Sequence, residues 1–325
     1  MTLAMISVVA FAIASMIYVC RFRGATRYAS VTECLRKSWP IFAPLNCLLY
    51  IFTQSRARKS IIATNDFKEL AEIQQHWQTI TEEAVRLYQQ QGFESAKNPE
   101  LPAYYDVGFR TFYKYGWSKF YLKWYGYTHD SAKQSCPDTV RILKKIPSVN
   151  GAMFSILPAG SQLTRHADPI ACSLRYHLGL VTPNSEDCFI NVDGVPYSWR
   201  DGEAFLFDET YLHYARNDSD RYRLILMCDI ERPMSFIGRF VNLFYQQVMK
   251  WAIVPNTVGD KRGLANQVFS RLAPISGRVR KLKSSSKGLY LLIKYTVNTT
   301  LIALMVSLLA GLLLALSSMT SLFVS

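Results

Sequence analysis

A run of short apolar stretches divided by turn signals, from Gly151 to Pro233, constrains the fold more than any other feature of the chain. Asp193-Gly194 is a strong hairpin signal, and Asp201-Gly202 marks a further turn. The predicted strands are Met153–Leu157, Cys172–Val181, Cys188–Val192, Val195–Trp199, Ala204–Phe207, Leu212–Ala215 and Tyr222–Ile230. No helix-length segment separates them, which argues against an α/β fold. The sequence therefore predicts a mainly β domain, either an antiparallel barrel or a double-sheet jelly roll.

Basic side chains fall on the inside of this predicted domain. Side chains alternate between the two faces of a strand, so Arg175 and His177 share one face of Cys172–Val181, opposite a row of leucines and a tyrosine. Arg223 lies on the last predicted strand. An unpaired buried guanidinium is costly, so each arginine needs an anion. A dicarboxylate co-substrate could supply it. The alternative partners are the nearby acids Asp208, Glu209 and Asp229.

A possible metal-ligand set begins at T-R-H-A-D-P, which places His166 and Asp168 two residues apart, and ends at His213 in D-E-T-Y-L-H-Y-A-R-N. On a strand edge, His166 and Asp168 would project to the same side. Two imidazoles and one carboxylate suit Fe(II) and leave coordination positions open. Zinc is a rival metal, but no H-E-x-x-H glutamate accompanies the ligands. A pair of hydrogen-bonded polar residues at the barrel mouth is the third alternative.

The charges gather beside two apolar ends. Leu3–Cys20 holds eighteen uncharged residues; eight Lys/Arg and one acid follow in 21–59, and eleven Lys/Arg and one acid lie in 239–294. Basic segments beside apolar runs are typical of chains held against anionic lipid headgroups. The central part of the chain has no basic face interleaved with aromatic residues, so the sequence does not indicate nucleic-acid binding. The sequence predicts transmembrane helices at 1–22 and 297–324. The N-terminal run is predicted to be an uncleaved anchor, because a cleaved signal would carry its basic residues before the apolar run. The basic flanks of both runs predict that the central domain faces the cytoplasm, since cytoplasmic segments are enriched in Lys and Arg.

Helices are predicted on both sides of the β core. Residues 64–92 have helical apolar spacing that ends near Gly92. Residues 236–253 predict an amphipathic helix that either lies on the membrane or packs on the barrel. The stretch from 259 to 287 is basic and loop-like. The seven cysteines are odd in number and contain no C-x-x-C, so they predict no disulfide framework and indicate a reducing compartment.

The chain resembles the aspartyl/asparaginyl β-hydroxylase family, and within it the lipid A hydroxylases. The matching stretches are G-W-S-K-F-Y-L-K-W-Y-G, K-I-P-S-V-N-G-A-M-F-S-I-L-P-A-G-S, H-A-D-P, S-L-R-Y-H-L-G-L-V-T-P-N, D-G-V-P-Y-S-W-R-D-G-E-A-F-L-F-D-E-T-Y-L-H-Y-A-R-N and C-D-I-E-R-P-M. The resemblance implies a double-stranded β-helix, which is a jelly roll, that uses Fe(II), 2-oxoglutarate and O₂. Ascorbate is a candidate further cofactor.

The resemblance also implies roles for individual residues. His166 and His213 match the family's iron histidines, and Asp168 completes the ligand set where some protein-modifying members carry glycine. The positions that match the family's 2-oxoglutarate site are Ser155, Arg175, His177 and Arg223, with Arg223 opposite the far carboxylate. Trp117 is our choice for the family's upstream tryptophan.

The implied organisation of the chain has five segments. The segments are an N-terminal anchor (1–22), a basic interfacial segment (23–63), an Fe(II)/2-oxoglutarate dioxygenase domain (64–235, with its β core at about 150–232), an amphipathic basic membrane-surface segment (236–296) and a C-terminal transmembrane helix (297–324).

The reaction implied by the resemblance hydroxylates C2 of a secondary acyl chain of lipid A, or of its precursor, at the bacterial inner membrane. The alternatives are hydroxylation of Asp or Asn in a protein and a non-enzymatic binding module. The oligomeric state is not predicted.

Overall fold

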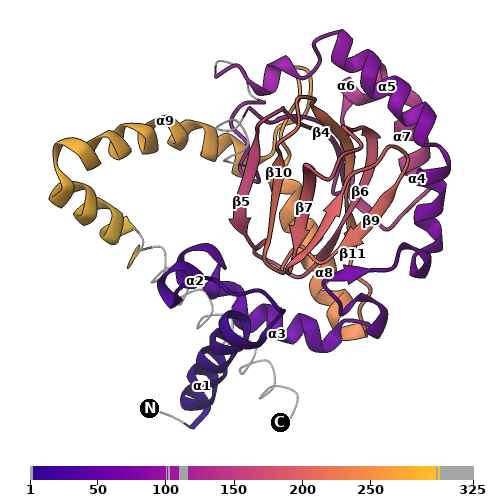
Figure 1. The fold of residues 1–325 in the computed structure, drawn as a ribbon. Coiled ribbons are helices and arrows are strands. Elements are labelled where there is room, and N and C mark those ends of the chain that lie inside the picture. Colours follow the sequence, from indigo (N-terminus) through magenta and orange to yellow (C-terminus); the bar gives the residue numbers. More distant parts are fainter. Residues whose placement is uncertain (1–2, 100, 102, 110–115, 298, 301–325) are drawn as a thin grey trace, which may run out of the picture. The chain divides into compact units, whose positions relative to one another are not determined.

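A computed structural model describes residues 3–99, 101, 103–109, 116–297 and 299–300. The chain divides into two compact units, one up to Phe269 and one from Ser270, and each is described by itself. The first unit contains the β domain with its flanking helices (Figure 1). The second unit contains most of helix α9 (Leu264–Ser285).

A seven-stranded antiparallel sheet forms the back of the β domain. Its strand order is β1-β9-β6-β11-β4-β2-β3. The strands are β1 (Ile61–Ile62), β2 (Ser118–Trp124), β3 (Tyr127–Thr128), β4 (Val149–Leu157), β6 (Ser173–Val181), β9 (Ala204–Phe207) and β11 (Arg223–Glu231). The central strands β4, β6 and β11 are buried along almost their whole length because both faces of the sheet are covered.

A four-stranded sheet, in the order β5-β10-β7-β8, faces the large one (Figure 1). Its strands are β5 (Gln162–His166), β7 (Cys188–Val192), β8 (Val195–Ser198) and β10 (His213–Asn217). An aromatic-rich core fills the space between the sheets, and it includes Trp117, Trp199, Phe205 and Phe207. The two facing sheets confirm the predicted mainly β, jelly-roll-like architecture.

Short helices cover the outer face of the large sheet. They are η3 (Ser55–Ala57), η4 (Thr64–Asp66), η5 (Lys68–Leu70), α4 (Ala71–Gln75), α5 (Trp77–Gln89), η6 (Glu94–Ala96), α6 (Asp130–Ser135) and α7 (Pro137–Lys144). A second apolar core lies here and joins Ile80 and Leu143 of the helices to the outward leucines of β6 and β11. The helical spacing predicted over 64–92 is confirmed in part: α5 is a regular helix, but the stretch before it consists of short helical pieces interrupted at Phe67 and at His76.

All seven predicted strands are present, with ends shifted by at most a few residues. The sequence missed two strands that matter for the site. β5 is polar and mostly exposed, so it lacks the apolar alternation that marks a strand. β2 lies in a stretch rich in aromatic residues for which no strand was predicted.

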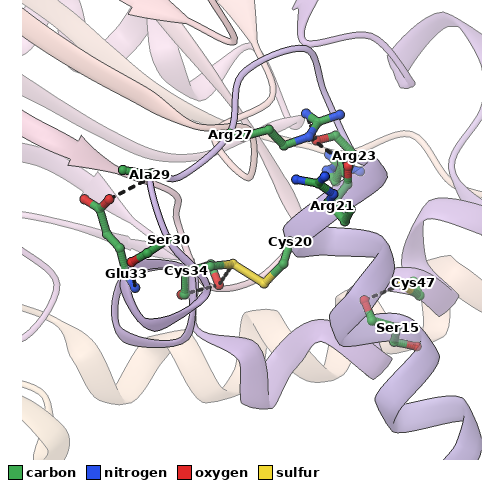
Figure 2. The surroundings of a disulfide bond; sticks show 11 residues. Ser15, Cys20, Arg21, Arg23, Arg27, Ala29, Ser30, Glu33, Cys34 and Cys47 are labelled. Atoms are coloured by element: carbon green, nitrogen blue, oxygen red, sulfur yellow. Dashed lines mark hydrogen bonds between the residues drawn. A yellow bond between two sulfur atoms is a disulfide. The ribbon is translucent and has the colours of Figure 1, made fainter.

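The N-terminal region contains α1 (Leu3–Ile17), a π-helical turn η1 (Tyr18–Phe22), α2 (Val31–Lys37), η2 (Pro40–Phe42) and α3 (Ala43–Phe52). A disulfide joins Cys20 to Cys34 (Figure 2). The odd cysteine count did not predict this bond, and it runs against the inference of a reducing compartment. The other five cysteines are free.

No helix in the described part of the chain combines the length and the apolar character needed to cross a membrane. The spanning anchor predicted for 1–22 therefore has no support from α1, which is 15 residues long. The spanning helix predicted for 297–324 falls almost entirely outside the described residues. The loop predicted over 259–287 is wrong for Leu264–Ser285, which is helical.

Helix α8 (Phe236–Met249), followed by η8 (Lys250–Ala252), packs through one face and exposes the other. A Cβ at Gly238 would lie 2.8 Å from side-chain atoms of both Phe52 and Met234, so glycine lets α8 approach α3 closely. Asn242, one turn later, is fully buried. Phe236, Phe240 and Phe244 lie on the opposite face and are 85%, 73% and 69% exposed. One face of α8 thus packs on the protein, as one of the two alternatives for 236–253 predicted, and contact of the exposed face with a membrane stays a prediction.

Candidate metal and co-substrate site

The three predicted metal ligands come together at one end of the small sheet. His166 ends β5 and His213 begins β10, and the two residues are paired across the antiparallel strands. Their ring centroids are 4.3 Å apart, and His166 Nε2 lies 3.6 Å from Asp168 Oδ1. One ligand atom from each of the three residues falls within 4.8 Å of the others. The geometry is that of a site able to hold one metal ion.

Backbone contacts orient both imidazoles. His166 Nδ1 lies 2.8 Å from the Thr164 carbonyl oxygen, and His213 Nδ1 lies 2.9 Å from the Tyr211 carbonyl oxygen. A carbonyl only accepts a hydrogen bond, so in each neutral ring Nδ1 carries the proton and Nε2 keeps its lone pair. Burial, reinforced by His166, holds the pKa of His213 well below its usual range. The two backbone contacts therefore leave Nε2 of each ring free to bind a metal ion.

Asp168 lies just past the end of β5 rather than on the strand edge that we predicted. Its N–H donates to the Glu209 carbonyl at 2.9 Å, and its Oδ2 lies 3.2 Å from Arg175 Nη2. These two contacts hold the carboxylate beside the histidines without a strand. Neither contact could be inferred from the H-x-D spacing, because both partners lie outside that motif.

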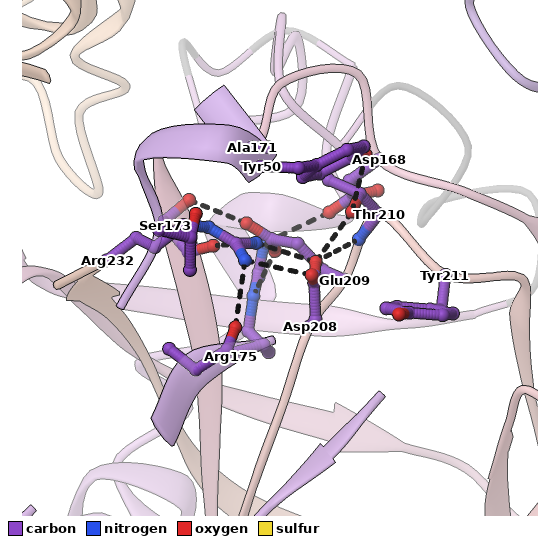
Figure 3. Close-up of polar contacts among 12 residues, drawn as sticks. Tyr50, Asp168, Ala171, Ser173, Arg175, Asp208, Glu209, Thr210, Tyr211 and Arg232 are labelled. Atoms are coloured by element: carbon purple, nitrogen blue, oxygen red, sulfur yellow. Dashed lines mark hydrogen bonds and ion pairs between the residues drawn. The ribbon is translucent and has the colours of Figure 1, made fainter. Parts of the chain in front are cut away.

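Arg175 is surrounded by acids (Figure 3). It forms ion pairs with Glu209, Asp168 and Asp229, with the Nε to Asp229 Oδ1 distance at 3.3 Å. Burial, reinforced by Glu209 and opposed by Arg175, raises the pKa of Asp229 to about 6. The alternative of partner acids therefore holds for Arg175. Its guanidinium orients Asp168 and Glu209, and the neighbouring carboxylates already neutralise its positive charge.

Arg223 has the opposite environment. Its side chain is 1% exposed, and it forms no ion pair with any described acid. Its Nε and Nη1 have no hydrogen-bond partner in the described part of the protein. The guanidinium carbon lies 4.3 Å from the Trp199 ring and 5.1 Å from the Trp117 ring, so two indoles flank the cation. Burial lowers the pKa of Arg223 to about 10.

Two further polar atoms on the interior face of the large sheet lack partners among the described residues. They are Ser155 Oγ on β4 and His177 Nε2 on β6. His177 Nδ1 accepts a hydrogen bond from Trp199 Nε1 at 3.3 Å, so the proton of the neutral ring is on Nε2. Burial, reinforced by Arg223 and Arg175, keeps the pKa of His177 well below its usual range. His177 is therefore a neutral donor.

Ser155, His177 and Arg223 thus give a hydroxyl, an imidazole N–H and a guanidinium on three neighbouring strands, β4, β6 and β11. Buried donors without acceptors are expensive, so this set fits an anion with several oxygen atoms. A carboxylate meets the need, and a guanidinium fork binds it with two hydrogen bonds. The sequence missed the role of Trp199. A tryptophan beside the Asp201-Gly202 turn was the available signal for Trp199.

Residues 74–233 match the family model described as Aspartyl/Asparaginyl beta-hydroxylase. The chain contains a domain of this family. The matched range ends at the last strand of the β core and includes the metal cluster and the interior donors described above. The resemblance to the aspartyl/asparaginyl β-hydroxylase family drawn from the sequence motifs is thereby confirmed.

Two relatives show the breadth of the family. The chain is 38% identical over 127 residues to an ornithine lipid ester-linked acyl 2-hydroxylase of Rhizobium tropici, and the match covers 39% of this chain and 45% of that protein. It is 30% identical over 166 residues to the human aspartyl/asparaginyl beta-hydroxylase, which covers 50% of this chain and 21% of that protein. The chain thus spans less than half the length of either relative.

Among solved structures, a Pseudomonas putida prolyl-4-hydroxylase aligns with a TM-score of 0.27 and 16% sequence identity. The alignment covers 36% of this chain and 72% of that chain. A TM-score this low carries no argument, so the fold assignment rests on the two facing sheets themselves.

Proposed function

We propose that the chain is an Fe(II)/2-oxoglutarate-dependent hydroxylase that acts on C2 of a lipid acyl chain. One observation carries the proposal: a two-histidine, one-carboxylate cluster lies in the same β domain as a buried guanidinium that has no acid partner in the described chain. A metal site alone would fit many activities. A metal site with a receptor for a carboxylate co-substrate favours this class.

The residues have distinct roles in this proposal. His166, Asp168 and His213 hold Fe(II), which with 2-oxoglutarate and O₂ supplies the oxidising power for C–H hydroxylation. Arg223 binds the far carboxylate of 2-oxoglutarate.

Supporting residues complete that co-substrate site. Ser155 and His177 donate further hydrogen bonds to 2-oxoglutarate, and Trp117 and Trp199 exclude water around the Arg223 cation. Arg175, predicted as a direct co-substrate ligand, is assigned instead to orient Asp168. Ascorbate stays a candidate for keeping iron reduced.

A lipid substrate is supported by the surface and by the most similar relative named above. The three phenylalanines of α8 form an exposed apolar face, which fits a lipid surface better than water. The printed name of the Rhizobium tropici relative describes hydroxylation of position 2 of an acyl chain. We propose lipid A or its precursor as the substrate, with the domain at the cytoplasmic face of the bacterial inner membrane.

The test is mass spectrometry of lipids from cells that carry or lack the gene. A gain of one oxygen on a secondary acyl chain of lipid A supports the proposal. A gain on ornithine lipid instead would keep the reaction and change the substrate. The His213→Ala variant should abolish the product while still fractionating with membranes, because it removes one iron ligand and no surface group.

A protein substrate is the second candidate, favoured by the match to the human aspartyl/asparaginyl beta-hydroxylase. An unchanged lipid profile together with hydroxylated Asp or Asn in cellular proteins would replace the first proposal with the second. Full lipid hydroxylation by His213→Ala would contradict the iron assignment itself.

A further inference from the structure

A cavity of about 490 Å³ lies outside the metal site, between the N-terminal helices and the β domain. Part of its wall is apolar, from Phe11 and Ala14 of α1 and Ile51 of α3. The rest is polar and includes Arg23, Asp208 and Arg232. The volume of the cavity is in the range of small-molecule binding sites. A wall that is partly apolar and partly charged suits an amphiphilic ligand.

The polar wall has more positive than negative charge. Arg23 Nη2 lies 2.8 Å from Asp208 Oδ2. Arg232 Nη2 lies 2.7 Å from Asp208 Oδ1 (Figure 3). Two buried guanidiniums thus share one carboxylate. The Nε atoms of both arginines are buried and have no hydrogen-bond partner among the described residues. One further anion at this wall would balance the charge and supply acceptors.

Arg23 is held in a fixed place. Its guanidinium carbon lies 3.5 Å from the centre of the Tyr50 ring and 4.0 Å from that of the Tyr211 ring. Its Nη2 also donates to Thr210 Oγ1 at 2.8 Å. A guanidinium already ordered between two aromatic rings loses little further freedom on binding an anion.

One short segment connects this cavity to the metal cluster. Asp208 and Tyr211 line the cavity, whereas Glu209 between them pairs with Arg175 on the metal side. The Tyr211 carbonyl accepts the hydrogen bond that orients His213. An occupant of the cavity would therefore touch residues directly linked to the metal ligands.

We propose that this cavity binds the anionic headgroup of a phospholipid, with the phosphate at Arg23 and Arg232 and the start of an acyl chain along Phe11, Ala14 and Ile51. The site does not depend on the hydroxylation reaction, since it rests on the cavity and its charges. Free inorganic phosphate has the same anionic chemistry but no acyl chain.

The experiment is native mass spectrometry of the full-length protein in detergent, offered phosphatidylglycerol, phosphatidylcholine or inorganic phosphate. One phosphatidylglycerol should remain bound in preference to phosphatidylcholine. Arg23→Gln should weaken that retention on the order of tenfold, the effect of losing one charge-assisted hydrogen bond. The variant should fold because Asp208 keeps Arg232 as its partner.

Arg21→Gln is the matched control, because Arg21 is exposed, lies two residues away and loses the same charge. An equal loss in both variants would mean a general charge effect and would overturn the site. Ala14→Trp keeps every charge and fills the apolar wall, so it should also lose the lipid. Retention unchanged in Arg23→Gln and Ala14→Trp, or inorganic phosphate competing on equal terms, would overturn the lipid assignment.

Discussion

Arg223 distinguishes this site from an ordinary buried ion pair. Arg175 lies in the same β domain and is satisfied by three carboxylates, whereas Arg223 is flanked by two indoles and has no described acid beside it. A protein that leaves a cation in this state loses folding free energy. Binding of an anion to Arg223 would recover this folding free energy, which gives a physical reason for the arrangement.

The Arg223→Met variant should therefore separate binding from stability. Loss of about 3 kcal/mol of charge-assisted hydrogen bonding corresponds to a roughly hundredfold higher KM for 2-oxoglutarate. The free energy of unfolding without co-substrate should stay equal or rise, because an unpaired buried charge is removed. Kinetics and urea unfolding of the full chain measure the two effects.

Arg221→Met is the control for Arg223→Met. Arg221 is exposed and lies two residues from Arg223, so its replacement by methionine removes the same charge outside the core. It should leave the KM for 2-oxoglutarate unchanged. A KM that is also unchanged in Arg223→Met would refute the co-substrate role of Arg223.

At the scale of elements, a buried carboxylate joins two of the covering helices. Glu83 on α5 accepts hydrogen bonds from the N–H of Asp138 at 3.0 Å, and from the N–H and Oγ1 of Thr139 at 2.8 and 2.6 Å. These groups form the first turn of α7, where an anion also interacts favourably with the helix dipole. The contact fixes α7 against α5 over the outer core.

Glu83→Ala should lower the free energy of unfolding by about 4 kcal/mol, since it leaves the N–H and hydroxyl of buried Thr139 and the partly buried N–H of Asp138 without their acceptor. Glu83→Gln should cost less, because the amide oxygen still accepts one hydrogen bond. Glu82→Ala, on the exposed side of the same helix, should change stability by no more than about 0.5 kcal/mol. Equal effects of Glu82→Ala and Glu83→Ala in urea unfolding would contradict the capping role.

The apolar face of α8 is the element that we expect to meet the lipid. Phe240→Asp combined with Phe244→Asp puts two charges on that face without touching the packed residues Gly238 and Asn242. The KM for a lipid substrate in vesicles should rise about tenfold or more, because burial of two aromatic side chains is lost.

The same double variant should leave the iron site unaffected. Consumption of 2-oxoglutarate in the absence of lipid therefore should not change. Val195→Asp, an exposed apolar position on β8, is the control and should leave the lipid KM unaltered. An unchanged lipid KM in the double variant would remove α8 from the lipid-binding surface.

For the whole molecule, sequence reasoning succeeded where a periodic pattern reports burial. The alternation in Cys172–Val181 predicted β6 and the inward direction of Arg175 and His177. It failed where contacts join distant segments, as in the hydrogen bond from the Asp168 N–H to the Glu209 carbonyl, although Glu209 had been named as a possible partner of Arg175. It also missed β5, which is too polar to show alternation, and α9, whose interior proline is unfavourable in helices.

The Cys20–Cys34 disulfide bears on how the molecule is oriented at a membrane. Disulfides persist in oxidising compartments, whereas the proposed cytoplasmic orientation would keep both thiols reduced. Alkylation of intact cells with a membrane-permeant reagent, followed by denaturing mass spectrometry, reports the state of each cysteine. The orientation proposed above predicts that Cys20 and Cys34 both react.

Cys47, which is free and partly exposed, is the internal control for access of the reagent. If Cys47 reacts while Cys20 and Cys34 are protected until a reductant is added, the N-terminal region faces an oxidising compartment and the cytoplasmic placement is wrong.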